Sequence, residues 1–152
     1  MVPSKLRAKV VAKRIEWVRR MLTQIKSLPL ESYDTFSSDS RNVASAESYL
    51  RRALEALLDL GRHILAKGFG VGVAEYKRIA QELIRASILT NEDAERLRIL
   101  AGYRNRMVHF YQEISDQELY EICVKDLSDI EQLLEVMLRW INEHPHMIDQ
   151  TL

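Results

Sequence analysis

Apolar residues recur every three or four positions through most of this chain, which is the spacing of an α-helix with one buried face. In the first such stretch the apolar positions are Val11, Ile15, Val18, Leu22 and Ile25. We predict that this helix ends near Leu28, because Pro29 cannot continue a helix and also restricts the residue before it. The polar residues 32–42 that follow predict a loop.

The second stretch has the most regular pattern of the chain. Its apolar positions alternate steps of three and four: Val43, Ala46, Leu50, Ala53, Leu57, Leu60 and Ile64. Such a narrow seam favours nearly antiparallel packing, as in a helical bundle. The glycine-rich segment 68–72 predicts a helix C-cap and a turn. A phosphate-binding loop is the less favoured interpretation, because no β-strand precedes the glycines.

Three further helices follow. The apolar positions of a short one are Tyr76, Ile79, Ala80, Leu83 and Ile84. Thr90 resembles the N-cap of a helix that reaches about Phe110, and Ser115, followed by Glu118, opens a last helix that continues to Ile141. We find no convincing strand pattern. The sequence therefore predicts an all-α fold, an up-and-down helical bundle of four main helices plus one shorter helix. It forms a single domain over residues 1–152, with a flexible tail from about residue 144.

Composition and charge narrow the functional classes. The chain has 22 Lys plus Arg and 22 Asp plus Glu among 152 residues, so its formal net charge is zero. This balance argues against coating nucleic acid or an anionic membrane by bulk electrostatics, although it allows a local basic site. The single cysteine, Cys123, excludes an intrachain disulfide framework and fits a reducing compartment. No signal peptide or membrane span is apparent, so we expect a cytoplasmic protein.

The predicted helix 91–110 breaks its own apolar pattern. At about 100° per residue, Arg104 falls in the same stripe as Leu97 and Ala101, and burial of an unpaired guanidinium is costly. On the polar face, Asn105 precedes His109 by one turn, a spacing that allows the amide to bind the imidazole. Gly102 shares that face although it costs about 1 kcal/mol relative to alanine, and a glycine there allows another backbone to approach closely.

Other interpretations of these residues are open on spacing alone. Arg104 can extend to the rim of the core or pair with a carboxylate from elsewhere in the chain. A histidine beside an asparagine can be a structural histidine. Periodicity and composition therefore do not by themselves establish an active site.

The segment Arg104–Tyr111 (RNRMVHFY) resembles the R-N-x-x-x-H-x-Y signature of HEPN-domain ribonuclease toxins of the HepT group. These toxins are partners of minimal nucleotidyltransferases in prokaryotic toxin–antitoxin pairs. The order of the predicted helices is also similar, most clearly from Val43 to Ile141. The resemblance implies a metal-independent endoribonuclease that needs no cofactor. It also implies a homodimer in which the motifs of two copies face one cleft. On a regular helix Arg104 and His109 are about 140° apart, and a two-fold axis would bring them together from both sides.

The resemblance also suggests a role for each motif residue. His109 would move a proton to and from the RNA, and Arg104 would hold the scissile phosphate. Asn105 would orient the imidazole or contact the phosphate, while Arg106 and Arg98 would add positive potential for RNA binding. Tyr111 resembles the tyrosine that the nucleotidyltransferase antitoxin adenylylates, and the alternative is a core or interfacial tyrosine.

Two other functional classes compete with the ribonuclease. One is a non-catalytic HEPN module that binds a nucleotide or a nucleotidyltransferase, and the other is a helical interaction protein in which the motif is a coincidence. We expect no metal site. His144 and His146 flank a proline without further ligands, and the carboxylates Glu55 and Asp59 are interpreted as parts of solvated helix faces.

Overall fold

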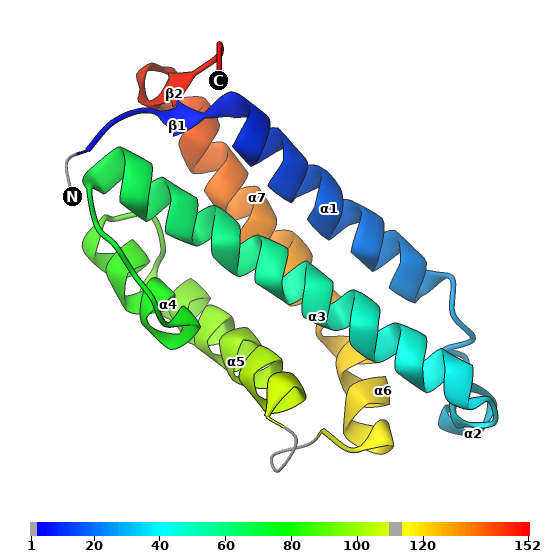
Figure 1. The fold of residues 1–152 in the computed structure, drawn as a ribbon. Helices are drawn as coiled ribbons and strands as arrows, with labels where there is room; N and C mark the ends of the chain where they lie inside the picture. The colour runs from blue at the N-terminus through cyan, green and yellow to red at the C-terminus, as the bar shows by residue number, and fades with distance from the viewer. Residues whose placement is uncertain (1–2, 110–113) are drawn as a thin grey trace.

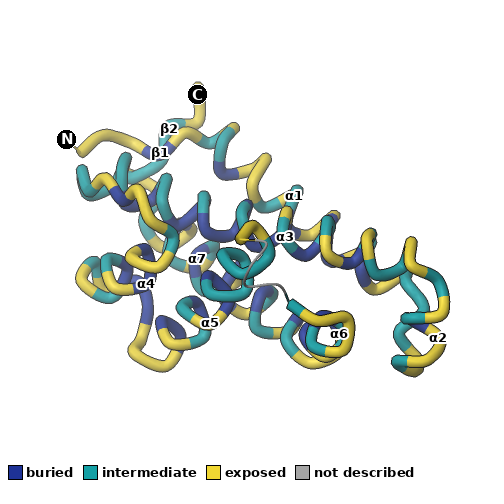
Figure 2. The backbone as a smooth tube through the Cα atoms, turned by 60° about the horizontal axis from the view of Figure 1, so that its bottom comes forward, coloured by how far each residue is buried: buried dark blue, intermediate teal, exposed yellow. Residues whose placement is uncertain are grey.

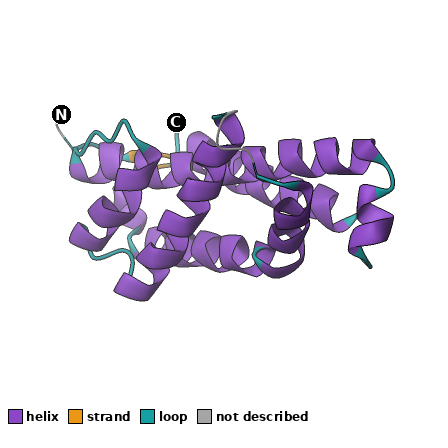
Figure 3. Cartoon of the chain, turned by 90° about the horizontal axis from the view of Figure 1, so that it is seen from below, coloured by secondary structure: helices purple, strands orange, loops and turns teal. Residues whose placement is uncertain are grey.

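The computed structural model describes residues 3–109 and 114–152, and most of these belong to helices (Figures 1 and 3). The α-helices are α1 (Ala8–Lys26), α2 (Tyr33–Ser37), α3 (Ser40–His63), α4 (Tyr76–Arg85), α5 (Asn91–Val108), α6 (Asp116–Lys125) and α7 (Leu127–Glu143). The predicted all-α class is therefore confirmed. None of the helices in the described ranges combines the length and the apolar character needed to cross a membrane.

Helix α3 is the centre of the bundle. It runs beside α1 and α7, while α4 and α5 pack together on another side of it (Figure 1). The seam predicted for this helix is buried, and Leu50, Leu57 and Leu60 are each 0% exposed. In Figure 2 the buried positions recur along the inner sides of the long helices. The three-and-four spacing of the sequence therefore gives the core directly.

The helix starts predicted from capping residues are confirmed. The side chain of Thr90 accepts a hydrogen bond from the backbone N–H of Asp93 at 3.1 Å, and α5 begins at the next residue. Ser115 caps α6 in the same way, through the N–H of Glu118 at 3.1 Å. Each cap satisfies one of the N–H groups that the first turn of a helix leaves without a partner.

Two predicted boundaries are wrong. The predicted last helix is divided into α6 and α7 at Asp126, whose φ of −106° and ψ of −3° depart from regular helix geometry. The carboxylate of Asp126 accepts a hydrogen bond from the Tyr103 hydroxyl at 3.1 Å, a tertiary contact that the local sequence does not reveal. The predicted loop 32–42 contains α2, which is capped by Ser32 and anchored by the fully buried Phe36.

The glycine-rich segment ends the α3 region as predicted. The helix continues from α3 into a π-helical turn, η1 (Ile64–Gly68). Gly70 then takes the left-handed conformation with a φ of 67°, which a residue without a side chain adopts readily. The N–H of Val71 closes the turn by donating to the carbonyl of Leu65 at 2.9 Å. A C-cap and turn are therefore confirmed.

The residues predicted as a tail fold back onto the start of the chain. After a 3-10 helix, η3 (Pro145–Met147), strand β2 (Ile148–Asp149) pairs in parallel with β1 (Leu6–Arg7). This pair was not predicted, because two residues are too few to show the alternation of a strand. It places both chain ends at the same end of the bundle (Figure 1).

Candidate active site

A cleft of about 520 Å³ lies between the end of α3, the start of α4 and the end of α5. Its lining residues are Arg62, Ala74, Glu75, Tyr76, Lys77, Arg104, Asn105 and His109. The three residues predicted to be catalytic, Arg104, Asn105 and His109, therefore line one cleft of a single chain.

The end of α5 explains how they come together. We predicted a regular helix to about Phe110, but α5 ends at Val108, and His109 is extended with φ −101° and ψ 99°. The backbone N–H of His109 still donates to the carbonyl of Asn105 at 3.1 Å. The predicted angle of about 140° between Arg104 and His109 is therefore wrong, because His109 is not part of the helix. Phe110 and Tyr111 lie outside the described residues.

The polar contacts that the guanidinium of Arg104 makes with the described residues are long. Its Nη1 donates to Oδ1 of Asn105 at 3.3 Å, and its Nη2 lies 3.9 Å from Oε2 of Glu55. Its Nε is buried and has no hydrogen-bond partner in the described part of the chain. Glu55 itself is held more closely by Arg51, at 2.8 Å. Arg104 therefore pairs weakly with a carboxylate, and the residues that the structure describes leave most of its donor capacity unused.

A network beside Arg104 was missed by the sequence analysis. Oδ1 of Asp59 accepts hydrogen bonds from the Tyr76 hydroxyl at 2.9 Å and from Nη1 of Arg62 at 3.2 Å. The interpretation of Asp59 as part of a solvated face is therefore wrong. Burial raises the pKa of the Tyr76 phenol, and the hydrogen bond and charge of Asp59 raise it further, so the hydroxyl stays protonated and remains a donor at neutral pH.

One sequence signal could have indicated this network. Charged residues recur along α3 at steps of four, four and three: Arg51, Glu55, Asp59 and Arg62. That spacing places them on one helix face beside the apolar seam. A charged stripe next to a buried seam is where partly buried polar contacts are expected. The participation of Tyr76, which comes from α4, depends on tertiary packing and has no local signal.

The two arginines predicted to bind RNA do not line this cleft. Arg106 forms a bidentate pair with Glu118, with both N–O distances at 2.7 Å, and this pairing lowers the pKa of the Glu118 carboxyl. Arg98 donates to Glu95 at 3.0 Å and to Gln81 at 3.1 Å. Their contribution to RNA binding stays a prediction, and it would require these exposed or half-exposed pairs to exchange partners.

The outward face of α5 is open around Gly102. A Cβ atom added at Gly102 would meet nothing within 4 Å, and the neighbouring Ile99 is 47% exposed. On the apolar stripe, Leu97 and Ala101 are buried, whereas Val108, further along, is 42% exposed. This helix therefore presents apolar surface and a site of close approach that no described residue covers.

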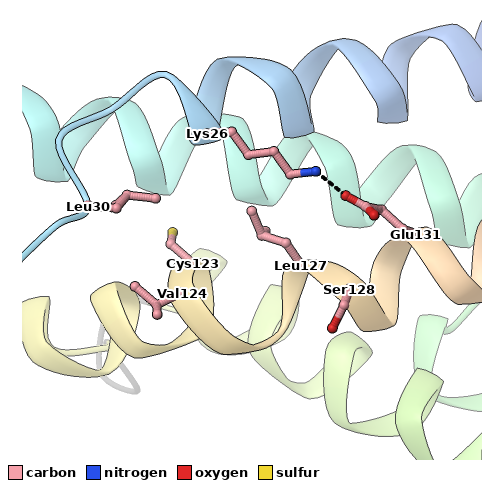
Figure 4. Close-up of a pocket in the computed structure, with 7 residues that line it drawn as sticks. All are labelled: Lys26, Leu30, Cys123, Val124, Leu127, Ser128 and Glu131. Carbon is pink, nitrogen blue, oxygen red and sulfur yellow. Dashed lines mark hydrogen bonds and ion pairs between the residues drawn. The ribbon is translucent and has the colours of Figure 1, made fainter.

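A second groove lies on the other side of the bundle (Figure 4). It has a volume of about 380 Å³ and is lined by Lys26, Leu30, Cys123, Val124, Leu127, Ser128 and Glu131. An ion pair between Lys26 and Glu131 spans it. Burial raises the pKa of the Cys123 thiol to about 12, so the thiol is protonated at neutral pH. As predicted, Cys123 is buried, and the groove contains none of the motif residues.

The C-terminal histidines take part in ring and backbone contacts. The ring of His144 stacks on Trp140 with centroids 4.4 Å apart, and its Nδ1 lies 2.7 Å from the carbonyl of Trp140. His146 lies against His144, with ring centroids 6.0 Å apart. Over residues 3–109 and 114–152, no three His, Cys, Asp or Glu side chains gather as a metal site would require.

Comparison with known proteins gives one family model and two similar proteins that agree with one another. The sequence model of a family described as "Ribonuclease HepT-like" matches residues 18–137. A tRNA nuclease HepT from Aphanizomenon flos-aquae (strain 2012/KM1/D3) is 29% identical over 112 residues, which cover 73% of this chain and 76% of that protein. An mRNA nuclease HepT from Shewanella oneidensis is 24% identical over 129 residues, which cover 84% of this chain and 96% of that protein.

A solved structure has the same fold. It is the tri-AMPylated Shewanella oneidensis HEPN toxin in complex with MNT antitoxin, which superimposes with a TM-score of 0.77 at 22% identity. The match covers 86% of this chain and 97% of that one. At this identity the likeness concerns the fold, and it extends to nearly the whole of the other chain.

Proposed function

This chain belongs to the ribonuclease HepT-like family, and from that premise we propose that it is an endoribonuclease whose active site is the cleft at the end of α5. The observation that carries the proposal is that Arg104, Asn105 and His109 line one cleft. The relatives it resembles act on tRNA and on mRNA, so we propose that this protein also cleaves RNA in the cytoplasm.

The residues of the cleft support a transesterification that needs no metal ion. An imidazole can accept a proton near neutral pH, so His109 takes the proton of a ribose 2′-hydroxyl. The 2′-oxygen attacks the adjacent phosphorus, and the bond from phosphorus to the 5′-oxygen breaks. A proton returned to that oxygen leaves a 5′-hydroxyl and a 2′,3′-cyclic phosphate. DNA lacks the 2′-hydroxyl and is not cut.

Arg104 and Asn105 act on the phosphate in this proposal. The unused donors of the Arg104 guanidinium hold the non-bridging oxygens and stabilise the charge that develops on them. Asn105 lies between Arg104 and His109 in the sequence, and its side chain contacts the phosphate or orients the imidazole. Arg106 and Arg98 supply positive potential along the approach to the cleft.

We propose that two copies pair through the open face of α5. Gly102 and the exposed Ile99 lie on that face, and they support close approach of a second helix. Light scattering of the purified protein should then give twice the 17.7 kDa of one chain. A mass of one chain at micromolar concentration would contradict the pairing. Arg104 and His109 of one chain line the same cleft, and this supports a site to which each copy contributes both residues.

We also propose that the protein is the toxin of a toxin–antitoxin pair and that a minimal nucleotidyltransferase is its antitoxin. The support is the structural likeness to the AMPylated HEPN toxin held by an MNT antitoxin, together with Tyr111 of the motif. Adenylate groups on Tyr111, two residues after His109, would bring negative charge to the site and oppose RNA binding. Intact-mass measurement after incubation with the nucleotidyltransferase and ATP tests this modification. An unchanged mass would contradict it.

The proposed activity has a direct test. Purified protein incubated with total RNA and a metal chelator should produce fragments that carry 5′-hydroxyl and cyclic-phosphate ends, while single-stranded DNA stays intact. Cleavage that appears only after a divalent metal is added would contradict the metal-independent mechanism. An absence of cleavage under all conditions would favour the alternative, a non-catalytic HEPN module that binds a nucleotide or a nucleotidyltransferase.

A further inference from the structure

The ring of Tyr76 lies against two guanidinium groups at the wall of the cleft. The Cζ atoms of Arg62 and Arg104 are each 4.6 Å from the centroid of this ring. At that distance the negative face of an aromatic ring attracts a cation. Tyr76 is therefore a contact shared by one arginine of α3 and the motif arginine of α5.

The two arginines differ in how the rest of the chain holds them. Nε of Arg62 donates to the carbonyl of Val73 at 2.9 Å, and its Nη2 donates to the carbonyl of Ala74 at 3.0 Å. Its Nη1 donates to Asp59, which also accepts from the Tyr76 hydroxyl. The donors of Arg62 are therefore occupied by the turn before α4 and by Asp59. Together, Arg62 and Asp59 hold the Tyr76 ring in position.

Arg104 has the opposite arrangement. Its polar contacts are the long ones to Asn105 and Glu55, and its Nε has no partner among the residues that the structure describes. The guanidinium also lies over the ring of Tyr76, at a distance suited to a cation–π contact. An aromatic face attracts the guanidinium without accepting its N–H groups, whereas a carboxylate at 2.8 Å would occupy them.

We propose that Tyr76 is a positioning residue that orients the Arg104 guanidinium in the cleft and leaves its N–H donors available to an RNA phosphate. Asp59 and Arg62 hold Tyr76 in place for this task. The inference rests on the proposed ribonuclease function and adds to it three residues outside the R-N-x-x-x-H-x-Y motif.

The test is steady-state cleavage of an RNA oligonucleotide by variants of the full chain. Tyr76→Leu removes the ring and should lower kcat by about tenfold and raise KM severalfold, because a misplaced Arg104 loses contacts to the phosphate both in the bound complex and in the transition state. Tyr76→Phe keeps the ring and should retain kcat within about threefold. Tyr76→Met, which fills a similar volume with a flexible chain, takes the place of the leucine variant if that variant does not fold.

Tyr103 provides a matched control on the adjacent position of α5. It is also a half-buried tyrosine that donates to an aspartate, Asp126, but it does not line the cleft. Tyr103→Leu should lower the melting temperature about as much as Tyr76→Leu and leave kcat unchanged. Equal loss of kcat in both leucine variants would overturn the proposal, as would a phenylalanine variant as impaired as Tyr76→Leu or a Tyr76→Leu variant with wild-type kcat.

A binding measurement separates this inference from the proposed function. The probe is a 2′-O-methyl RNA oligonucleotide, which cannot be cleaved, followed by fluorescence anisotropy. If the wild type cleaves nothing, the ribonuclease proposal fails, but Tyr76→Leu should still weaken binding by severalfold relative to Tyr76→Phe. Equal affinities of the two variants would by themselves overturn the positioning role of Tyr76.

Discussion

Replacing His109 with alanine should lower the rate of RNA cleavage by roughly a hundredfold to ten-thousandfold, the range expected for loss of a general acid–base group. The imidazole is the one motif side chain in the described cleft that can both accept and return a proton near neutral pH. His109 is exposed and lies after the last residue of α5. Its removal should therefore change the free energy of unfolding by less than about 0.5 kcal/mol.

The measurement is single-turnover cleavage of one RNA oligonucleotide at saturating protein. His146→Ala is the matched control, because His146 is also exposed and lies in η3, outside the cleft. We expect this control to cleave at the wild-type rate. Undiminished cleavage by His109→Ala, with a folded protein shown by circular dichroism, would remove His109 from the mechanism.

Replacing Arg104 with alanine should lower kcat by roughly a hundredfold to a thousandfold, as does loss of a preorganised donor to a developing oxyanion. The guanidinium offers charge and paired donors for a phosphate, and the described residues engage few of those donors. Glu55 keeps its closer partner, Arg51, in this variant, so no carboxylate is left without a counter-charge. The stability of the fold should accordingly change little.

Two further variants test whether the effect of Arg104→Ala comes from the guanidinium itself or from the loss of positive charge. Arg104→Lys keeps the charge but loses the planar donor fork, so we expect only partial recovery of kcat. Arg98→Ala, on the same helix but outside the cleft, should raise KM without lowering kcat. Wild-type kcat in Arg104→Ala would exclude the proposed phosphate contact, and a loss in Arg98→Ala equal to that in Arg104→Ala would show a general electrostatic effect instead.

The helices could be predicted from the sequence wherever a pattern and a cap agree. Thr90 and Ser115 each precede an apolar periodicity, and both cap the first turn as expected. The break at Asp126 could not be predicted, because the apolar spacing continues through Ile122 and Leu127 without a glycine or proline. The hydrogen bond from Tyr103 to Asp126 joins residues 23 positions apart and is invisible to local rules.

Of the residues that line the candidate site, the sequence indicated those of the motif. Arg104, Asn105 and His109 come from one short segment, so the resemblance could identify them together. The end of α5 at Val108 was missed, because no capping residue marks it. Asp59, Arg62 and Tyr76 were missed because Tyr76 contacts the two α3 residues and Arg104 only when α3, α4 and α5 pack together.

At Gly102 the stability of α5 within one chain and the association of two chains should respond in opposite directions to the same substitution. An alanine there would gain about 1 kcal/mol of helix stability, and within the described chain its methyl group would meet nothing. If a second helix packed against the glycine, the same methyl group would hold the two helices apart. One small substitution would thus raise the melting temperature of a lone chain while loosening the proposed dimer, so thermal resistance and self-association can be adjusted in opposite directions at this position.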